Sequence, residues 1–207
     1  MIEVVDQTIL QAIFDIEAEN CLCLNFASAK NPGGGWLTGA NAQEESIARS
    51  SGLFTIFQHY PNFFIANSYL KNCYYTDNVI YSPCVPVFRD DNHRLVKPVP
   101  MSFITAPAVN IGGLKQNRQF DNNKAVEIMK YRINKVLSIS AIHSHRTLLL
   151  GAWGCGAFQN DPEIIAKLFK EALCGTFDGV FEKIRFVIYT TKKDQENFNI
   201  FKSLLGY

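Results

Sequence analysis

Short apolar runs and longer amphipathic segments alternate along the chain. The runs have the length of buried strands and lie at Cys21–Phe26, Ser102–Ala106, Thr147–Ala152 and Ile184–Tyr189. The amphipathic segments repeat apolar residues at helical spacing and cover Ala42–Tyr60, Gln119–Ala141 and Glu196–Leu205. Residues Val4–Glu19 are expected to form a strand end followed by a helix. This alternation predicts an α/β fold, a three-layer α/β/α sandwich with a largely parallel or mixed central sheet.

The segment before residue 100 is less regular and predicts shorter elements. Asp90, Asp91 and Asn92 form a turn signal, and strand-like composition surrounds it at Val79–Ser82, Val85–Arg89 and Arg94–Lys97. Gly112 and Gly113 are expected to lie in a polar loop.

Composition limits the classes of function. The 207 residues suit one domain, 1–207, and the 47% hydrophobic fraction is enough for a core. A net charge of +1 predicts no membrane binding and no general binding of nucleic acid. The N-terminus lacks the basic region of a signal peptide, and no apolar run approaches the ~20 residues of a membrane helix. A cytoplasmic location is therefore expected.

The cysteines and histidines do not predict a metal site. The six cysteines include no CxxC pair, so reduced buried thiols are expected. Cys21 and Cys23 alternate on one strand and are expected to face the same side. His143 and His145 could bind a metal as a pair, but no third ligand has a matching spacing, so surface or helix-end histidines are expected.

Three consecutive glycines follow the first apolar run. Gly33, Gly34 and Gly35 stand between this strand and the helical segment that begins near Ala42. Strand, glycine loop and helix in this order place free backbone N–H groups and a helix N-terminus beside the loop, which favours an anion. The spacing is neither GxGxxG nor that of a P-loop. Taken alone, the glycines also fit a flexible turn.

Two glutamates open the following helix. Glu44 and Glu45 lie where the helix dipole favours carboxylates, so helix-start chemistry explains them without catalysis. Neighbouring helical residues point about 100° apart. The pair therefore cannot flank one bond as most glycosidase carboxylates do, and in catalysis one glutamate would act while the other positions.

A second strand and glycine loop lie near residue 155. Gly154 and Gly156 alternate after the apolar run Thr147–Ala152, with Phe158 beyond them. Asp161 and Pro162 fit the N-cap and first position of a helix. Because both glycine loops follow strands, they are expected at the carboxyl edge of the sheet, where open α/β sheets bind ligands.

The compound motif resembles a known family. GGG, then WLTGANA, then QEE, within LNFASAKNPGGGWL and AQEESIARSSGLF, resembles the signature of poly(ADP-ribose) glycohydrolases in their microbial form. TAPAVN and GAWGCGAF are similar to further stretches of that family. The resemblance implies a macrodomain fold and cleavage of a glycosidic bond in ADP-ribose polymer. It implies no cofactor and no metal.

The resemblance also implies roles for residues. Glu45 would protonate the leaving ribose oxygen and then activate water, and Glu44 would hold ribose hydroxyls. Gln43 belongs to the same motif, and either Asn25 or Ser28 would help to hold the distal ribose. Gly33, Gly34 and Gly35 would line the diphosphate together with Gly154, Cys155, Gly156 and Ala157.

Three aromatic or acidic positions each have two possible roles, one in binding the substrate and one in the structure. Phe158 would pack on the distal ribose, or it is a buried structural aromatic. Asp6 would read the adenine amino group, or it belongs to the capping group ahead of the first helix. Phe198 would stack on adenine, with Tyr189 as the second choice, and both are also ordinary core positions.

The substrate is expected to be poly(ADP-ribose) or an ADP-ribosylated macromolecule, with ADP-ribose as the product. Three alternatives stay open. The chain could remove single ADP-ribose units from a protein or nucleic acid, act as a non-catalytic ADP-ribose reader, or bind nucleotides in general. The intact Glu44–Glu45 pair favours an enzyme over a reader.

Overall fold

A mixed sheet forms the centre of the computed structural model, which describes residues 1–16, 20–70, 72–190 and 195–206. Its strand order is β1-β6-β5-β2-β4-β3. Every neighbouring pair is parallel except β3 and β4, which are antiparallel. The strands are β1 (Ile2–Val5), β2 (Cys21–Phe26), β3 (Ile80–Arg89), β4 (Leu95–Ala106), β5 (Thr147–Leu150) and β6 (Lys183–Val187).

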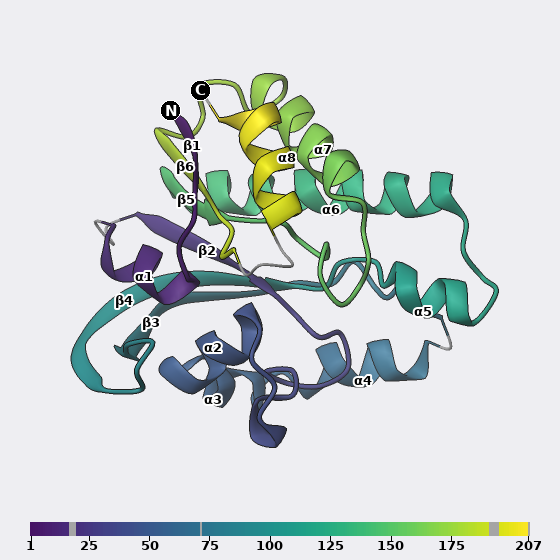
Figure 1. Cartoon of the computed structure of the whole chain (residues 1–207). Helices are drawn as coiled ribbons and strands as arrows, with labels where there is room; N and C mark the ends of the chain where they lie inside the picture. Colours follow the sequence, from purple (N-terminus) through teal and green to yellow (C-terminus); the bar gives the residue numbers. More distant parts are fainter. Residues whose placement is uncertain (17–19, 71, 191–194, 207) are drawn as a thin grey trace.

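Helices cover both faces of this sheet (Figure 1). The helices are α1 (Ile9–Phe14), α2 (Gln43–Ser50), α3 (Leu53–Phe57), α4 (Pro61–Tyr69), α5 (Ile111–Gln116), α6 (Asn122–Ile142), α7 (Pro162–Cys174) and α8 (Gln195–Leu205), with a 3-10 turn η1 at Trp36–Thr38. Figure 1 shows α6, α7 and α8 on one side, and α2, α3 and α4 on the other. The predicted three-layer sandwich with a mixed sheet is therefore confirmed.

Strand β2 shows how the sequence assigns residues to the two layers. Successive side chains of a strand point to opposite faces. Leu22 and Leu24 enter the core that α6, α7 and α8 complete. Cys21 and Cys23 enter the core that α1 to α4 complete, so the expectation that they face the same side is confirmed. The parallel strands β2, β4, β5 and β6 place their carboxyl ends at one edge, and the loops that follow them share that edge.

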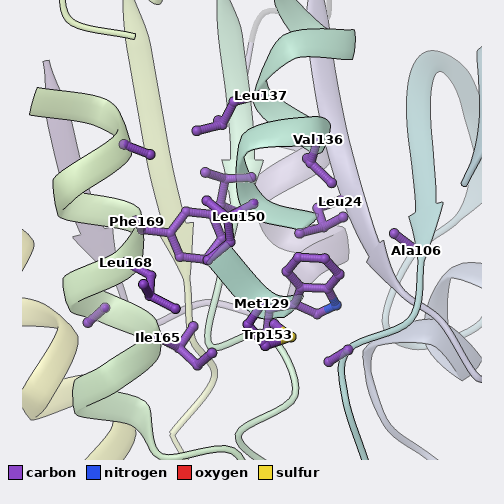
Figure 2. Packing of buried hydrophobic residues seen from close by; sticks show 14 of the residues in the cluster. Leu24, Ala106, Met129, Val136, Leu137, Leu150, Trp153, Ile165, Leu168 and Phe169 are labelled. Carbon is purple, nitrogen blue, oxygen red and sulfur yellow. The ribbon is translucent and has the colours of Figure 1, made fainter. Parts of the chain in front are cut away.

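The larger core reaches the turn after β5. Trp153 is fully buried there among residues such as Met129 and Phe169, and Figure 2 shows these side chains packed between the helices and the strands of the sheet. Removing so large a buried side chain typically costs 3–5 kcal/mol, an order-of-magnitude value. The turn that begins at Trp153 is thus fixed to the core at its base.

The prediction of separate short strands between residues 79 and 106 is wrong. The segments merge into β3 and β4, two long strands with register shifts after Ser82 and Val87. Prolines made the strands look interrupted, since proline cannot donate to a ladder. Pro83 and Pro86 lie on the edge strand β3, and Pro98 and Pro100 lie on β4 before its pairing with β2 begins at Ser102.

Two helix predictions also need correction. The segment Ala42–Tyr60 is interrupted at Ser51, which is extended and forms a bridge with Val87. This contact with a distant strand outweighs the helical pattern. The Gly112–Gly113 region is helix α5 rather than a loop, because the Asn110 side chain caps it by accepting a hydrogen bond from the Gly113 N–H at 2.9 Å.

Capping residues in the sequence correctly predicted where two helices begin. Asp161 caps α7 through its Oδ1, and Pro162 is the first helical residue. Thr8 caps α1, which ends at Phe14, and residues 17–19 of the helix expected there lie outside the described part of the chain. His143 is the exposed C-cap of α6, as expected, whereas His145 is buried with its Nε2 2.9 Å from the Tyr81 hydroxyl.

In the residues that the structure describes, no helix is long and apolar enough to cross a membrane. Within the same residues, no three His, Cys, Asp or Glu side chains gather as a metal-binding group.

Candidate functional site

A cavity of about 210 Å³ opens at the carboxyl edge of the sheet. Three loops and one helix start contribute to it. Ala27 and Ser28 follow β2, Ala108 follows β4, and the turn after β5 supplies Trp153, Gly154, Gly156, Ala157 and Phe158. Helix α2 supplies Gln43, Glu44 and Glu45. Segments more than 100 residues apart in the sequence thus meet at one concave site.

The first glycine loop packs directly on the glutamate side chains. Gly33 and Gly34 have φ of +70° and +65°, values that favour glycine. A Cβ atom on Gly34 would overlap Glu45 Oε1 and would lie 3.0 Å from Glu44 Oε2. Only glycine therefore lets the loop lie this close to both carboxylates.

Glu45 is held by two backbone donors. The Gly35 N–H donates to its Oε1 at 2.9 Å, and the Ala42 N–H donates to its Oε2 at 3.1 Å. The second bond is the helix-start contact that its position predicted. The side chain still lines the cavity, with 9% of the residue exposed. Glu45 thus both caps helix α2 and lines the cavity.

Glu44 lies deeper, with 4% of the residue exposed. Its Oε2 accepts a hydrogen bond from the Ser28 N–H at 2.6 Å. Its Oε1 is buried and has no hydrogen-bond partner among the described residues. Burial is the main cause that raises the pKa of Glu44 to about 8; the Ser28 bond opposes this shift and nearby Glu45 adds to it. Burial therefore favours the protonated form of Glu44, which keeps one oxygen free for a ligand.

Gln43 and Asn25 fix the base of the site. The Gln43 side chain accepts from the Phe26 N–H at 2.9 Å and donates to the Leu24 carbonyl at 2.7 Å, which ties α2 to β2. Asn25 is fully buried, donates to the Thr105 hydroxyl at 3.3 Å and lies close enough to Glu44 to lower the pKa of that carboxyl group. The structure thus places Asn25 behind Glu44, while Ser28 lines the cavity itself.

The second turn is shaped by Gly154 and Asn160. Gly154 has φ of +77°, and a Cβ atom there would lie 2.5 Å from the Ala108 Cβ. Asn160 is buried and donates from Nδ2 to the Val109 carbonyl at 2.7 Å and the Gly154 carbonyl at 3.1 Å. Sequence reasoning missed Asn160, because the adjacent N-cap Asp161 already accounted for a polar residue at that point.

The remaining residues of the second turn differ in accessibility. A Cβ atom on Gly156 would meet nothing within 4 Å, so this glycine leaves open space beside the cavity. Cys155 lies outside the cavity lining, and burial raises the pKa of its thiol. Phe158 is half-buried: it lines the cavity and also packs against the core. Both expectations for Phe158 therefore describe part of its surroundings.

A second cavity of about 530 Å³ continues the first towards β6 and β1. The two share five lining residues, namely Phe26, Ala42, Gln43, Ala152 and Gly156. Tyr189 lines the second cavity and is 59% exposed. Phe198 is not among its lining residues and packs against the core, with Lys202 over its ring. Of the two aromatics considered, the structure brings Tyr189 to the site.

Asp6 lies beside this second cavity, next to its lining residue Gln7. Its Oδ1 accepts a hydrogen bond from the Thr190 N–H at 2.8 Å. Bonds from Thr190 lower the pKa of Asp6, which is thus an anion that holds the segment after β6 beside the segment after β1.

Comparison with known proteins identifies the fold. The family model "Microbial-type PARG, catalytic domain" matches residues 1–90. Poly(ADP-ribose) glycohydrolase from Thermomonospora curvata has a TM-score of 0.94 and 39% identity over 99% of this chain and 76% of that chain. Its structure bound to the inhibitor ADP-HPD gives 0.93 and 39% over 98% and 78%.

A second bacterial enzyme is similar to the same degree. Poly(ADP-ribose) glycohydrolase from Deinococcus radiodurans in complex with ADP-ribose has a TM-score of 0.92 and 38% identity over 98% of this chain and 83% of that chain. No curated protein sequence matches. The resemblance first seen in the glycine and glutamate motif is confirmed, and the chain belongs to the microbial-type poly(ADP-ribose) glycohydrolases.

Proposed function

We propose that this chain cleaves the ribose–ribose O-glycosidic bonds of poly(ADP-ribose) and releases ADP-ribose. The observation that carries the proposal is the convergence of Glu44, Glu45 and the Gly154–Phe158 turn on one cavity. The enzymes from Thermomonospora curvata and Deinococcus radiodurans share this fold at 38–39% identity, and the latter was solved with ADP-ribose bound.

The two connected cavities suggest how the substrate lies. The adenosine end would occupy the cavity beside Tyr189, the aromatic side chain at that end of the site. The diphosphate would cross the backbone of Gly154–Ala157, and the glycine loop at residues 33–35, which lines neither cavity, would support the site through its contacts with Glu44 and Glu45. The distal ribose would then reach Glu44 and Glu45, with Phe158 packed against it. We propose these residues as the binding site on that basis.

Glu45 is the residue we propose as general acid and base. Its proton would pass to the ribose oxygen of the leaving polymer as the bond to the anomeric carbon breaks. The resulting carboxylate would take a proton from water while the water oxygen bonds to that carbon, which restores the acid. The Gly35 and Ala42 N–H bonds fix the orientation of this carboxyl group throughout.

Glu44 would position the sugar rather than transfer the proton. Its Oε2 is occupied by the Ser28 N–H, and its Oε1 is buried without a partner among the described residues. A buried polar atom without a partner is costly, and a ribose hydroxyl would satisfy it. The unpartnered Oε1 supports a sugar-positioning role for Glu44.

Three further proposals concern the whole chain. We propose that residues 1–207 form one catalytic domain, since the similar structures cover 98–99% of the chain. We propose a cytoplasmic location, which the free state of all six cysteines supports. We propose no general affinity for nucleic acid, because the net charge is only +1.

The Glu45→Gln variant tests the mechanism. We expect it to bind ADP-ribose with nearly wild-type affinity in calorimetry. We expect hydrolysis of labelled polymer to fall by at least about a hundredfold, since general acid–base catalysis contributes 10²–10⁴-fold. Glu163→Gln is the matched control, because Glu163 is an exposed glutamate in the first turn of α7, away from both cavities.

Two results would contradict the proposal. Equal turnover by wild type and Glu45→Gln would remove Glu45 from the chemistry. A wild type that binds ADP-ribose but cleaves neither polymer nor ADP-ribosylated peptides would indicate a reader, and cleavage of peptides alone would indicate a mono-ADP-ribosyl hydrolase.

A further inference from the structure

Three side chains continue the wall of the catalytic cavity outward. The Phe158 ring lines the cavity, and its centroid lies 6.1 Å from the centroid of the Tyr75 ring. The Lys30 ammonium lies 5.9 Å from the Tyr75 centroid. Phe158, Tyr75 and Lys30 come from three different loops and form one series that begins beside the glutamates and ends at the surface. We call this series the outer wall.

Tyr75 is held in an unfavourable backbone conformation. Its φ is +63°, which is uncommon for a bulky residue. Three groups fix it there: the Asn72 side chain accepts from its N–H, the Asn110 amide donates to its hydroxyl, and the Arg132 guanidinium donates to its carbonyl. Arg132 is only 2% exposed and also binds Asp77 at 2.8 Å. Strain that so many contacts maintain is typical of functional sites.

Lys30 provides a positive charge at the outer end. It is exposed, and among the described residues no carboxylate lies within ion-pair distance of its ammonium group. It stands two residues after Ser28, whose N–H binds Glu44. The backbone that fixes the proposed positioning glutamate therefore also places this cation.

The order of strands shows which part of the substrate passes this wall. The cavity beside Tyr189 reaches the ends of β1 and β6, whereas the cavity beside Glu45 is lined by residues that follow β5, β2 and β4. ADP-ribose bound as proposed, from Tyr189 to Glu45, would therefore point its anomeric carbon away from β6. The group attached to that carbon would continue past Phe158 towards Tyr75 and Lys30. In a polymer this group is the next ADP-ribose unit, which carries an adenine, two phosphates and two riboses.

We propose that Lys30 and Tyr75 form a subsite for the leaving group, a nucleoside diphosphate unit of the polymer. Lys30 binds a phosphate of that unit, and the Tyr75 ring supports its ribose or base. This inference rests on the proposed function. It makes Lys30 and Tyr75 specificity residues that favour polymer over substrates with small leaving groups.

The experiment measures kcat/KM of each variant on two substrates. One is poly(ADP-ribose), and the other is ADP-ribose that carries 4-nitrophenol on its anomeric carbon, which lacks the phosphates of the leaving unit. For Lys30→Glu we expect kcat/KM on the polymer to fall about tenfold, or about 1.4 kcal/mol, because the charge reversal replaces an attraction to the phosphate, worth up to about 1 kcal/mol at an exposed site, by a repulsion. The value on the nitrophenyl substrate is expected to stay within about twofold, and the loss on the polymer is expected to shrink at high salt.

Two further variants sharpen the test. Tyr75→Asn removes the ring while keeping a residue that tolerates positive φ, and it is expected to show the same selective loss on the polymer. Lys167→Glu makes an equal change of charge on the exposed face of α7 and is expected to leave both substrates unaffected. Lys30 is exposed, so its variants test the proposal even if the Tyr75 variant fails to fold.

The outcomes separate this subsite from the proposed function. If wild type cleaves the polymer and Lys30→Glu cleaves it equally well, the subsite is wrong and the function stands. Equal losses on both substrates, or on an ADP-ribosylated serine peptide as much as on the polymer, also overturn the subsite. A wild type that cleaves the nitrophenyl substrate but not the polymer overturns the polymer activity and the subsite together.

Discussion

The two turns that meet at the cavity are held by different kinds of residue. The first turn, residues 33–35, rests on the proposed catalytic side chains themselves, because Gly35 donates to Glu45 and Gly34 packs against both carboxylates. The second turn, residues 154–158, rests on buried residues outside the proposed chemistry. Trp153 fixes its start in the core, and Asn160 binds its backbone.

This difference predicts separable functions. A change in the first turn should move a reacting group, and the effect should appear mainly in kcat. A change in the second turn should alter the surface that receives the diphosphate and the ribose, and the effect should appear mainly in KM and in ADP-ribose affinity. The three predictions below test this separation, from the largest expected effect to the smallest.

Gly34→Ala is expected to have the largest effect. The added methyl group overlaps Glu45 Oε1, so the carboxyl group or the loop must move. A displacement of about 1 Å at a reacting group can cost about a hundredfold in rate, and we expect kcat on the polymer to fall by at least that factor. ADP-ribose affinity, measured by calorimetry, is expected to change by less than about tenfold.

Gly179→Ala is the control for backbone strain. Gly179 has φ of +69°, close to that of Gly34, but a Cβ atom there meets nothing within 4 Å. Both variants carry the strain of alanine at positive φ, and only Gly34→Ala carries the overlap with Glu45. Equal activity of the two variants would show that the contact between Gly34 and Glu45 does not position the carboxyl group.

Glu44, against which the first turn packs, should also make the stability of the protein depend on pH. Its pKa in the folded protein is about 8, raised from 4.5 mainly by burial. As the pH rises from about 5 to about 7.5, the unfolded chain loses this proton while the folded protein keeps it, so the free energy of unfolding of the wild type decreases. Glu44→Gln lacks this loss. Its stability relative to wild type should rise by roughly 3 kcal/mol over this range, at 1.36 kcal/mol for each pKa unit.

Urea denaturation of both proteins at several pH values measures this difference. Titrating groups that do not interact with residue 44 affect wild type and variant alike, so they cancel in the comparison. Glu163→Gln, an exposed glutamate in the first turn of α7, should give a difference that does not change over the same range. A flat difference for Glu44→Gln as well would mean that Glu44 ionises in the folded protein as it does in solvent.

The local parts of this architecture could be predicted from the sequence. Cys21–Phe26 is β2 with the predicted bounds, because a continuous buried strand leaves an uninterrupted apolar run. Asp161 and Pro162 start α7, since cap chemistry depends only on nearby residues. The glycine and glutamate motif identified the family for the same reason: its parts lie within 13 residues, Gly33 to Glu45.

Features that depend on distant partners could not be predicted. Ser51 ends α2 because it pairs with Val87, and no residue near Ser51 carries that signal. The sequence does not mark Tyr75 and Lys30 as functional residues. Their contact depends on the conformation of the loop that carries Tyr75, which Arg132 holds in place. The sequence ranks Phe198 ahead of Tyr189 for the adenine site, and only the packing of α8 shows that Phe198 belongs to the core and Tyr189 to the cavity.

Asn160→Ala tests the second turn and should have the smallest effect of the three. It removes the two bonds from Nδ2 to the carbonyls of Val109 and Gly154, although the backbone N–H of residue 160 still donates to the Gly154 carbonyl at 3.0 Å. We expect a loss of about 2 kcal/mol in the free energy of unfolding, because the Val109 carbonyl stays buried without this donor. Urea denaturation measures that loss.

Kinetics on the polymer then decide whether the two turns are separable. With the second turn loosened and both anchors of Glu45 intact, KM and the Kd of ADP-ribose should rise by roughly tenfold or less, while kcat stays within about threefold. Asn134→Ala is the matched control, because Asn134 also donates to a backbone carbonyl, that of Lys130, but on the exposed side of α6. A fall in kcat for Asn160→Ala as large as that for Gly34→Ala would mean that the two turns act as one unit, and that Glu45 depends on residues of both.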